Sequence, residues 1–248
     1  MQQQYPQKQG LDLILKRAFS YWSQTLGLQI MFSIVYFGIF MTVFYYFGMK
    51  YELFEGFQNA FLDYQEAGPS GIDDFKTAIA TITDTVNFQY FMFAMMGVRI
   101  FLYPLNIGFF QIYKKIDLKE NIEISDLFAG YNGINFFKFI SFFMFWVLIY
   151  SFITQTIILP IIWVMLTIFA APLMFFQNKR IFEILAIGWN ALRTNFIEIF
   201  VSVLVAFIFC YAGFAVFFVG ALFTFPFWNA MIYSLYTSLF EDKIQKAS

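Results

Sequence analysis

The sequence predicts an all-α integral membrane protein with about six transmembrane helices, arranged as three hairpins that each follow a cytoplasmic interfacial amphipathic helix. Hydrophobic residues make up 60% of the 248 residues and charged residues only 12%, about half of the ~25% that is typical of soluble domains. Several apolar runs exceed the roughly 20 residues needed to cross a hydrocarbon core about 30 Å thick. The basic residues fall mostly on alternate loops, which indicates an orientation.

Apolar runs predict six spans, at 26–48, 88–113, 136–159, 161–177, 196–218 and 220–240. A turn around Pro160 separates the third span from the fourth, and the neighbourhood of Gly220 separates the fifth from the sixth, so each pair is expected to form a tight hairpin. The alternative is five spans with one re-entrant hairpin. We expect a single membrane domain over 1–248, with the helical bundle at 88–240.

The N-terminal segment 1–25 is expected to be a cytoplasmic interfacial helix. From Leu11 onward its apolar residues recur at i, i+3, i+4 and i+7, whereas Asp12 and Lys16 occupy other faces. Such a helix lies flat in the headgroup layer with its aromatic side chains at headgroup depth. Because this region lacks a short apolar stretch with a small-residue cleavage site, we expect the first span to be retained as an anchor.

The basic residues predict which side of the membrane each loop occupies. With a cytoplasmic N-terminus and six spans, twelve of the fifteen Lys and Arg residues lie inside, Lys50 and Lys76 lie outside, and Arg99 falls within a span. The positive-inside rule favours this arrangement. We therefore expect a multi-pass protein of a bacterial-type cytoplasmic (inner) membrane, with both termini in the cytoplasm.

The segment 49–87 is the only sizeable region expected outside the bilayer. It is an acidic insertion with seven carboxylates and two lysines. The residues 68–71, Gly-Pro-Ser-Gly, interrupt it, and the acidic residues that follow are typical of a helix N-terminus. We predict a short external helix pair, which serves either as a solvated cap or as a surface for a partner.

A local pattern recurs in the three spans that return towards the cytoplasm. Each contains a Phe followed three residues later by a Pro, which places structural kinks at Pro104, Pro172 and Pro226. An amphipathic segment that opens with an acidic residue precedes each of the other spans, at Asp12, Asp126 and Glu183. The pattern predicts three repeated units. The alternative is ordinary membrane helices whose prolines coincide by chance.

These motifs also carry a resemblance to a protein family. The residues involved are Pro104, Gly108, Ala171, Pro172, the helix at 183–192, Pro226, Asn229, Ala230 and Tyr233. Over 88–240 the chain resembles a broad group of uncharacterised bacterial polytopic membrane proteins, which includes YciC-like proteins and the membrane domain fused to some glycerophosphodiester phosphodiesterases. In that group the hydrolase chemistry belongs to a separate soluble domain. The resemblance therefore implies a membrane module without phosphodiesterase activity.

The residue types present exclude most catalytic chemistry. The sequence has no His and a single cysteine, Cys210, which removes the usual general base, the commonest metal ligand and any CxxC motif or intrachain disulfide. We therefore expect no catalytic residue, metal or cofactor, and no enzymatic activity. The net charge of −1 leaves no basic face for a nucleic acid.

Arg99 is the charged side chain that falls deepest within a predicted span. A lone cation there costs at least ~2.5 kcal/mol, so we expect it to face the bundle interior and to meet neutral acceptors. Asn106, Gln155 and Asn229 are the candidates and complete the predicted binding residues. Arg99 is either a structural lock or a ligand for an anionic lipid headgroup or substrate, unless the span itself is misplaced.

The function expected from these observations is that of a binding or scaffold subunit in a larger membrane complex, of the kind that serves secretion or membrane biogenesis. Its partners would be membrane lipids and other membrane proteins. The alternative is a transporter or binder of lipid or of a small anionic molecule at an internal site near Arg99. A membrane-embedded enzyme ranks last, because it would have to work with Asp, Glu, Tyr or Arg alone.

Overall fold

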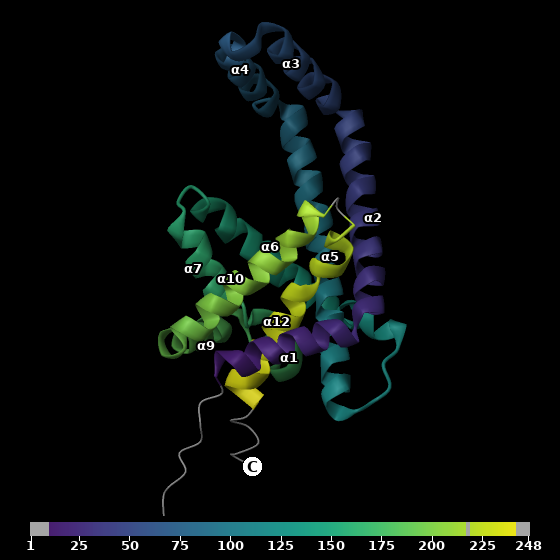
Figure 1. Cartoon of the computed structure of the whole chain (residues 1–248), viewed down its shortest axis with the longest axis vertical. Helices are drawn as coiled ribbons and strands as arrows, with labels where there is room; N and C mark the ends of the chain where they lie inside the picture. The colour runs from purple at the N-terminus through teal and green to yellow at the C-terminus, as the bar shows by residue number, and fades with distance from the viewer. Residues whose placement is uncertain (1–9, 217–218, 242–248) are drawn as a thin grey trace, which may run out of the picture. The chain divides into compact units, whose positions relative to one another are not determined.

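The computed structural model describes residues 10–216 and 219–241, which are drawn in colour in Figure 1. All regular elements among these residues are helical, and no strand occurs in this part of the chain. The chain divides into two compact units, of which unit 1 contains Met1–Ile34 and Tyr103–Ser248 and unit 2 contains Val35–Leu102. The single membrane domain over 1–248 stays a prediction.

Five helical segments are long and apolar enough to cross a membrane. They are α2 (Leu26–Lys50), α5 (Val86–Leu118), α6 (Ile134–Ile153), α7 (Ile158–Thr167) with α8 (Ala170–Gln177), and α10 (Phe196–Ala212) with the 3-10 helix η3 (Gly213–Ala215). These segments coincide with the first five predicted spans, although residues 217–218 of the fifth lie outside the described residues. An all-α chain with several helices of membrane-spanning length is therefore confirmed.

The region of the predicted sixth span, 220–240, is discontinuous. It consists of α11 (Ala221–Thr224), α12 (Phe227–Tyr236) and η4 (Thr237–Glu241), a π-helical turn. Pro226 lies between α11 and α12, where its missing N–H interrupts the helical hydrogen bonding. No single piece of this region reaches the length of a span, so the number of crossings stays a prediction.

The turn between the third and fourth spans lies earlier than predicted. α6 ends at Ile153 and α7 begins at Ile158, so the turn precedes Pro160 instead of surrounding it. Pro160 belongs to the first turn of α7, where a backbone N–H would have no acceptor within the helix and its loss costs nothing.

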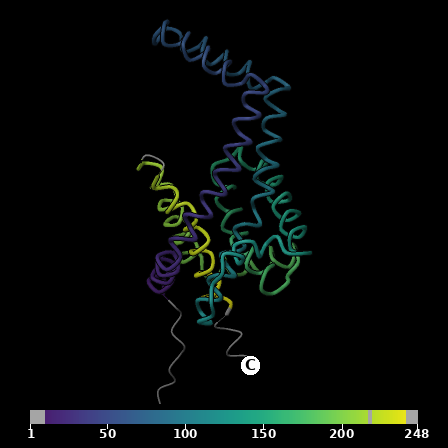
Figure 2. The backbone as a smooth tube through the Cα atoms, turned by 90° about the vertical axis from the view of Figure 1, so that its right-hand side faces the viewer, coloured from purple at the N-terminus to yellow at the C-terminus, as the bar shows by residue number. Residues whose placement is uncertain are grey.

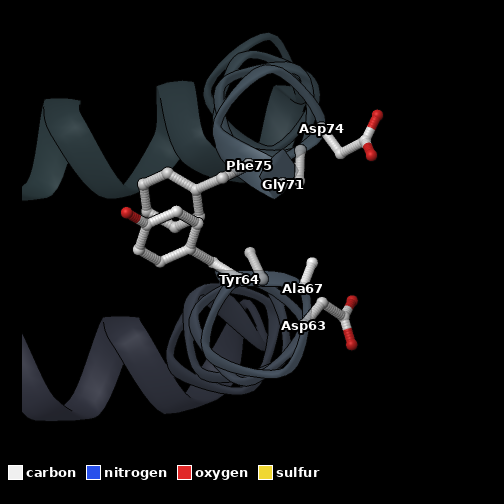
Figure 3. Close-up of a pocket in the computed structure, with 8 residues that line it drawn as sticks. Asp63, Tyr64, Ala67, Gly71, Asp74 and Phe75 are labelled. Atoms are coloured by element: carbon white, nitrogen blue, oxygen red, sulfur yellow. The ribbon is translucent and has the colours of Figure 1, made fainter. Parts of the chain in front are cut away.

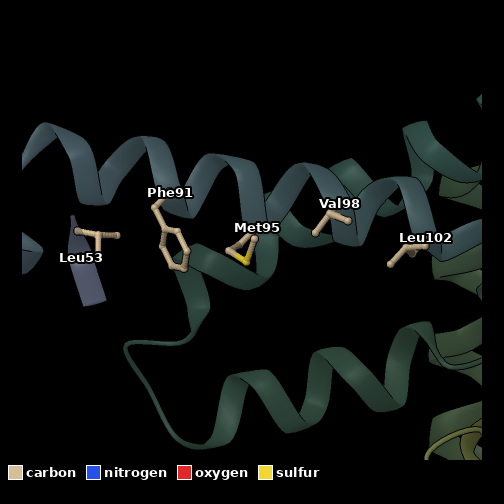
Figure 4. Close-up of a cluster of buried hydrophobic side chains, with 5 residues drawn as sticks. All are labelled: Leu53, Phe91, Met95, Val98 and Leu102. Atoms are coloured by element: carbon tan, nitrogen blue, oxygen red, sulfur yellow. The ribbon is translucent and has the colours of Figure 1, made fainter. Parts of the chain in front are cut away.

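Unit 2 is a helical hairpin whose tip is the predicted insertion. Residues of α2 lead into α3 (Leu53–Ala67), the 3-10 turn η1 (Gly68–Gly71) and α4 (Ile72–Thr83), and the chain returns through α5 (Figure 2). The predicted helix pair with its break at 68–71 is confirmed. Its buried core is formed by Leu53, Phe91, Met95, Val98 and Leu102 (Figure 4). Four of these follow the i, i+4, i+7, i+11 spacing that places side chains on one helix face.

Each of the three predicted amphipathic segments is helical. The first is α1 (Leu11–Gln24), the third is α9 (Ile181–Thr194), and the second is a 3-10 helix, η2 (Ile124–Tyr131). Asp126 of η2 accepts a hydrogen bond from the Glu123 backbone N–H at 2.8 Å and pairs with Lys115 at 2.8 Å. The acidic residue that opens the second segment therefore anchors it to α5. Residues 1–9 of the predicted N-terminal helix lie outside the described residues.

The three amphipathic segments pack against helices that carry the recurring prolines. α1 packs on α12, and the Ser234 hydroxyl donates to the Ile14 carbonyl at 2.6 Å. α9 packs on α7 and α8, and η2 packs on α5. Glycine permits the last two contacts, because a Cβ at Gly188 would overlap the carbonyl of Leu166 and a Cβ at Gly130 would overlap that of Pro104.

Lys138 of α6 fixes the C-terminus of α8. Its amine donates to the Met174 carbonyl at 2.6 Å and to the Asn178 Oδ1 at 2.7 Å. Asn178 follows α8 in the left-handed conformation with φ 53°, which asparagine adopts readily at helix ends. A cation at this position also complements the negative end of the helix dipole. These hydrogen bonds join α6 to the end of α8.

Candidate functional site

Two of the four predicted binding residues meet within unit 1. Asn229 of α12 donates its amide hydrogen to the Oδ1 of Asn106 on α5 at 3.1 Å, and only 2% of Asn229 is exposed. The Asn106 amide in turn donates to the Tyr103 carbonyl at 3.2 Å. A buried amide costs free energy unless it is paired. This pair therefore specifies how α5 and α12 face each other.

A second polar group joins the same two helices to α1. The side chains of Tyr21, Tyr113 and Tyr233 form a triad with ring centroids 5.2 to 5.5 Å apart. Both carboxylate oxygens of Asp117 are engaged, because the hydroxyls of Tyr21 and Tyr233 donate to them at 2.7 and 2.8 Å. Sequence reasoning missed this group. The signal was available in the i+4 spacing of Tyr233 from Asn229 and the i+11 spacing of Asp117 from Asn106.

Gln29 closes this network from α2 and is fully buried. Its amide nitrogen donates to the Thr25 hydroxyl at 3.0 Å and lies 3.4 Å from the Tyr113 hydroxyl. Its carbonyl oxygen Oε1 has no hydrogen-bond donor in the structure. An unpaired buried acceptor costs about 1–3 kcal/mol. The Gln29 oxygen could therefore accept a further hydrogen bond.

The other two predicted binding residues do not join this network. Arg99 belongs to unit 2, whereas Asn106 and Asn229 belong to unit 1, and its side chain is exposed instead of facing an interior. Gln155 is also exposed and lies in the turn between α6 and α7. At 33 residues, α5 is about 50 Å long, which exceeds a hydrocarbon core of about 30 Å.

The three predicted kink residues occupy different settings. Pro104 lies inside the unbroken α5, and Pro172 lies in the first turn of α8, shortly after α7 ends. Pro226 separates α11 from α12 and cannot donate to the carbonyl four residues earlier, that of Leu222. The Ser33 hydroxyl supplies the missing donor at 2.8 Å. A side chain from α2 thus satisfies the acceptor that the proline leaves free.

A separate feature lies in the hairpin of unit 2, where a shallow groove of about 320 Å³ runs between α3 and α4. Figure 3 shows the Asp63 and Asp74 carboxylates pointing to the same side of the hairpin, with the rings of Tyr64 and Phe75 on the other side. These rings pack with centroids 5.2 Å apart. The groove is therefore apolar along its floor and acidic along one edge.

These arrangements limit the chemistry that the described residues can perform. The polar network of unit 1 consists of neutral amides and hydroxyls together with one carboxylate, that of Asp117. This carboxylate already accepts two hydrogen bonds. Within the described ranges, no group of three His, Cys, Asp or Glu side chains could hold a metal ion. The network is suited to specifying helix packing, and the groove is suited to contact with a cationic or amphipathic group.

Comparison with known proteins gave no match: no model of a protein family, no characterised protein and no solved structure is significantly similar to this chain. The resemblance to YciC-like proteins therefore rests on the motifs in the sequence alone.

Proposed function

We propose that this chain is a non-enzymatic integral membrane protein that acts as a binding or scaffold subunit of a larger membrane complex. One observation carries the proposal: Phe61, Leu62 and Ile72 of the hairpin are exposed by 50%, 45% and 39%. The surrounding segment 49–87 has seven carboxylates, which keep it out of the hydrocarbon core. Lipid tails therefore do not cover these apolar side chains, whereas a protein partner would.

The orientation supports a partner outside the cytoplasm. The twelve-to-two distribution of Lys and Arg favours cytoplasmic termini and an external hairpin in a bacterial-type inner membrane. Five crossings would leave the two termini on opposite sides of the membrane, against this distribution, so we propose the broken region 220–240 as a sixth crossing. The Ser33 bond to Leu222 supports this placement, because it satisfies a backbone carbonyl that could not meet water inside a bilayer.

A repeated architecture is the natural reading of the helix packing, and we include it in the proposal. η2 packs on α5 with Pro104, α9 packs on α7 and α8 with Pro172, and α1 packs on α12 next to Pro226. The segments η2 and α9 each cover the proline-bearing helix of the hairpin that precedes them in the chain. The first segment, α1, has no preceding hairpin and covers the corresponding helix of the last one. Contacts of this kind link each repeat to the next and the last repeat to the first, which suits a scaffold for other membrane proteins.

The alternative function is the binding of lipid or of a small anion. The position of Arg99 supports this alternative in a more limited form. In this form, we propose that its exposed side chain on α5 binds the phosphate of a lipid headgroup. The internal amides that would have completed a substrate site, Asn106 and Asn229, pair with each other instead. Contact with membrane lipids is therefore favoured over transport through the bundle.

Purification of the full chain from its native membrane in a mild detergent, followed by native mass spectrometry, tests the proposal. We expect a heteromeric complex that also contains another protein. The triple variant Phe61→Ser, Leu62→Ser and Ile72→Ser should release that protein while the chain itself stays folded. A control variant, Thr77→Ala with Thr81→Ala, removes two exposed hydroxyls that bond within their own helix and should leave the complex intact. A lone monomer with bound lipid in every preparation would refute the scaffold proposal.

A further inference from the structure

The hairpin also has an acidic side, which lies apart from the exposed side chain of Phe61 and borders that of Leu62. Along α3, the residues Glu55, Asn59, Asp63 and Glu66 follow the spacing i, i+4, i+8 and i+11, which places them in one stripe along the helix. In α4, Asp73 and Asp74 stand in the first turn. Lys76 is the only basic residue in the two helices, so the negative charge of this side is largely uncompensated.

The groove between the two helices has an apolar floor beside these carboxylates. Small side chains make the floor, because Ala60, Ala67, Gly71 and Ala78 line the groove. Gly71 lets the helices come together at the tip, since a Cβ there would lie 2.6 Å from the Cβ of Ala67. Bulkier side chains at these positions would fill the hollow of about 320 Å³.

The two carboxylates at the groove are available for a ligand. Asp63 and Asp74 are exposed, and no ion pair or hydrogen bond joins either side chain to another residue in the described part of the chain. Asp73, in contrast, already pairs with Lys76 at 3.0 Å. In Figure 3 the Asp63 and Asp74 side chains extend from opposite helices towards the same side, so one group placed between them would face both charges.

We infer that this groove docks a basic amphipathic segment of a partner protein, with a Lys or Arg head between Asp63 and Asp74 and its aliphatic stem on the alanine floor. The stem of a long cationic side chain is apolar and packs on such a surface while its head stays in water. This inference rests on the proposed function. That function requires a protein partner, and the inference states the chemical class of the partner segment.

Charge complementarity selects this occupant over the others. A second copy of the chain would bring the same carboxylates to the interface, and like charges placed together are unfavourable. Anionic lipid headgroups would be repelled for the same reason. A metal ion lacks a third ligand, because no group of three candidate ligands occurs in the described ranges. A basic segment satisfies both the acidic edge and the apolar floor.

A pair of synthetic peptides tests the inference on the full chain in phosphatidylcholine nanodiscs, which offer no anionic lipid. One probe is an 18-residue helix with Lys on one face and Ala and Leu on the other, and the second has Glu in place of each Lys. We expect the Lys peptide to bind and the Glu peptide not to bind. Raising the salt concentration should weaken the binding, because the contributing charges are exposed.

Variants separate the groove from the general negative charge of the protein. Asp63→Asn with Asp74→Asn should raise the Kd about three- to tenfold, as expected for two exposed charge pairs, and Ala78→Leu should weaken binding by filling the groove without changing charge. Glu120→Gln with Glu183→Gln removes two carboxylates from unit 1 and should leave the Kd unchanged. Circular dichroism checks that each variant keeps its helical content.

Three results would overturn the inference: equal binding of both peptides, no binding of the Lys peptide, or an unchanged Kd in the Asp63 and Asp74 variant. Self-association lost in Ala78→Leu would identify a second copy as the occupant, and binding to phosphatidylglycerol vesicles would identify lipid. If the Asp63 and Asp74 variant loses peptide binding but still purifies in the native complex, the groove is not where the partner docks, and the scaffold function stands. Peptide binding by a chain that purifies without a partner would reject the scaffold function instead.

Discussion

Ser33 and Pro226 offer a quantitative test of how the broken helix region is stabilised. The Ser33 hydroxyl donates to the Leu222 carbonyl at 2.8 Å, and this carbonyl lacks its usual donor because Pro226 has no N–H. Ser33→Ala removes this side-chain donor. Pro226→Ala restores a backbone donor at the position from which an intrahelical bond to Leu222 would come, so the two substitutions should compensate each other.

The size of the effect follows from the burial of the bond. Ser33 is fully buried, and an unpaired buried polar group costs about 1–3 kcal/mol. Measured hydrogen bonds between membrane helices are weaker, with an average of about 0.6 and a maximum of about 1.7 kcal/mol. We therefore expect Ser33→Ala to lower the free energy of unfolding by about 0.5–2 kcal/mol, and by much less in the Pro226→Ala background.

Equilibrium unfolding in mixed micelles of SDS and a mild detergent measures these differences. The double-mutant cycle isolates the coupling between the two positions. Ser151→Ala is the matched control, because the Ser151 hydroxyl donates to the Val147 carbonyl within its own helix and that carbonyl can keep its backbone donor. The same loss for Ser33→Ala in both backgrounds, or a loss no larger than that of Ser151→Ala, would refute this explanation.

Three further substitutions test contacts in the bundle and in α5, again by unfolding in mixed micelles. Asn229→Leu should cost about 1–2 kcal/mol because it leaves the Oδ1 of Asn106 without its donor, and adding Asn106→Leu should recover part of that loss; a larger loss in the double variant would contradict the pairing. Gly108→Ala should destabilise by more than 1 kcal/mol, because the new Cβ would overlap the backbone of η2. Gly97→Ala, where a Cβ meets nothing within 4 Å, should be neutral or stabilising. Lys138→Met should cost about 1–2 kcal/mol through loss of the bonds at the end of α8, and an unchanged stability would argue against that capping role.

The features that the sequence predicted well depend on local patterns. Apolar runs placed five segments of spanning length, and the Gly-Pro-Ser-Gly break at 68–71 placed the tip of the hairpin correctly. The turn near Pro160 was misplaced because proline also suits the first turn of a helix. The break at Pro226 was expected as a kink, but the residue that compensates for it, Ser33, lies far away in the chain.

The candidate site was predicted only in part, for a similar reason. Asn106 and Asn229 were recognised as neutral acceptors, yet their pairing with each other depends on how α5 faces α12, which the sequence does not encode in a local pattern. Arg99 was expected to face inward because its burial cost was estimated for mid-bilayer. In the structure its side chain is exposed on α5, which no local pattern in the sequence indicated. The Asp117 network was missed because aromatic residues are too common here to stand out.

Photo-cross-linking from position 61 in living cells tests whether the hairpin meets another protein. A benzophenone amino acid would replace Phe61 in α3, and the same residue would replace Phe207, an exposed phenylalanine of α10, as the control expected to contact lipid. Our account predicts adducts between position 61 and a second protein, and lipid adducts from position 207. Lipid adducts alone at position 61, or protein adducts only to further copies of this chain, would contradict it.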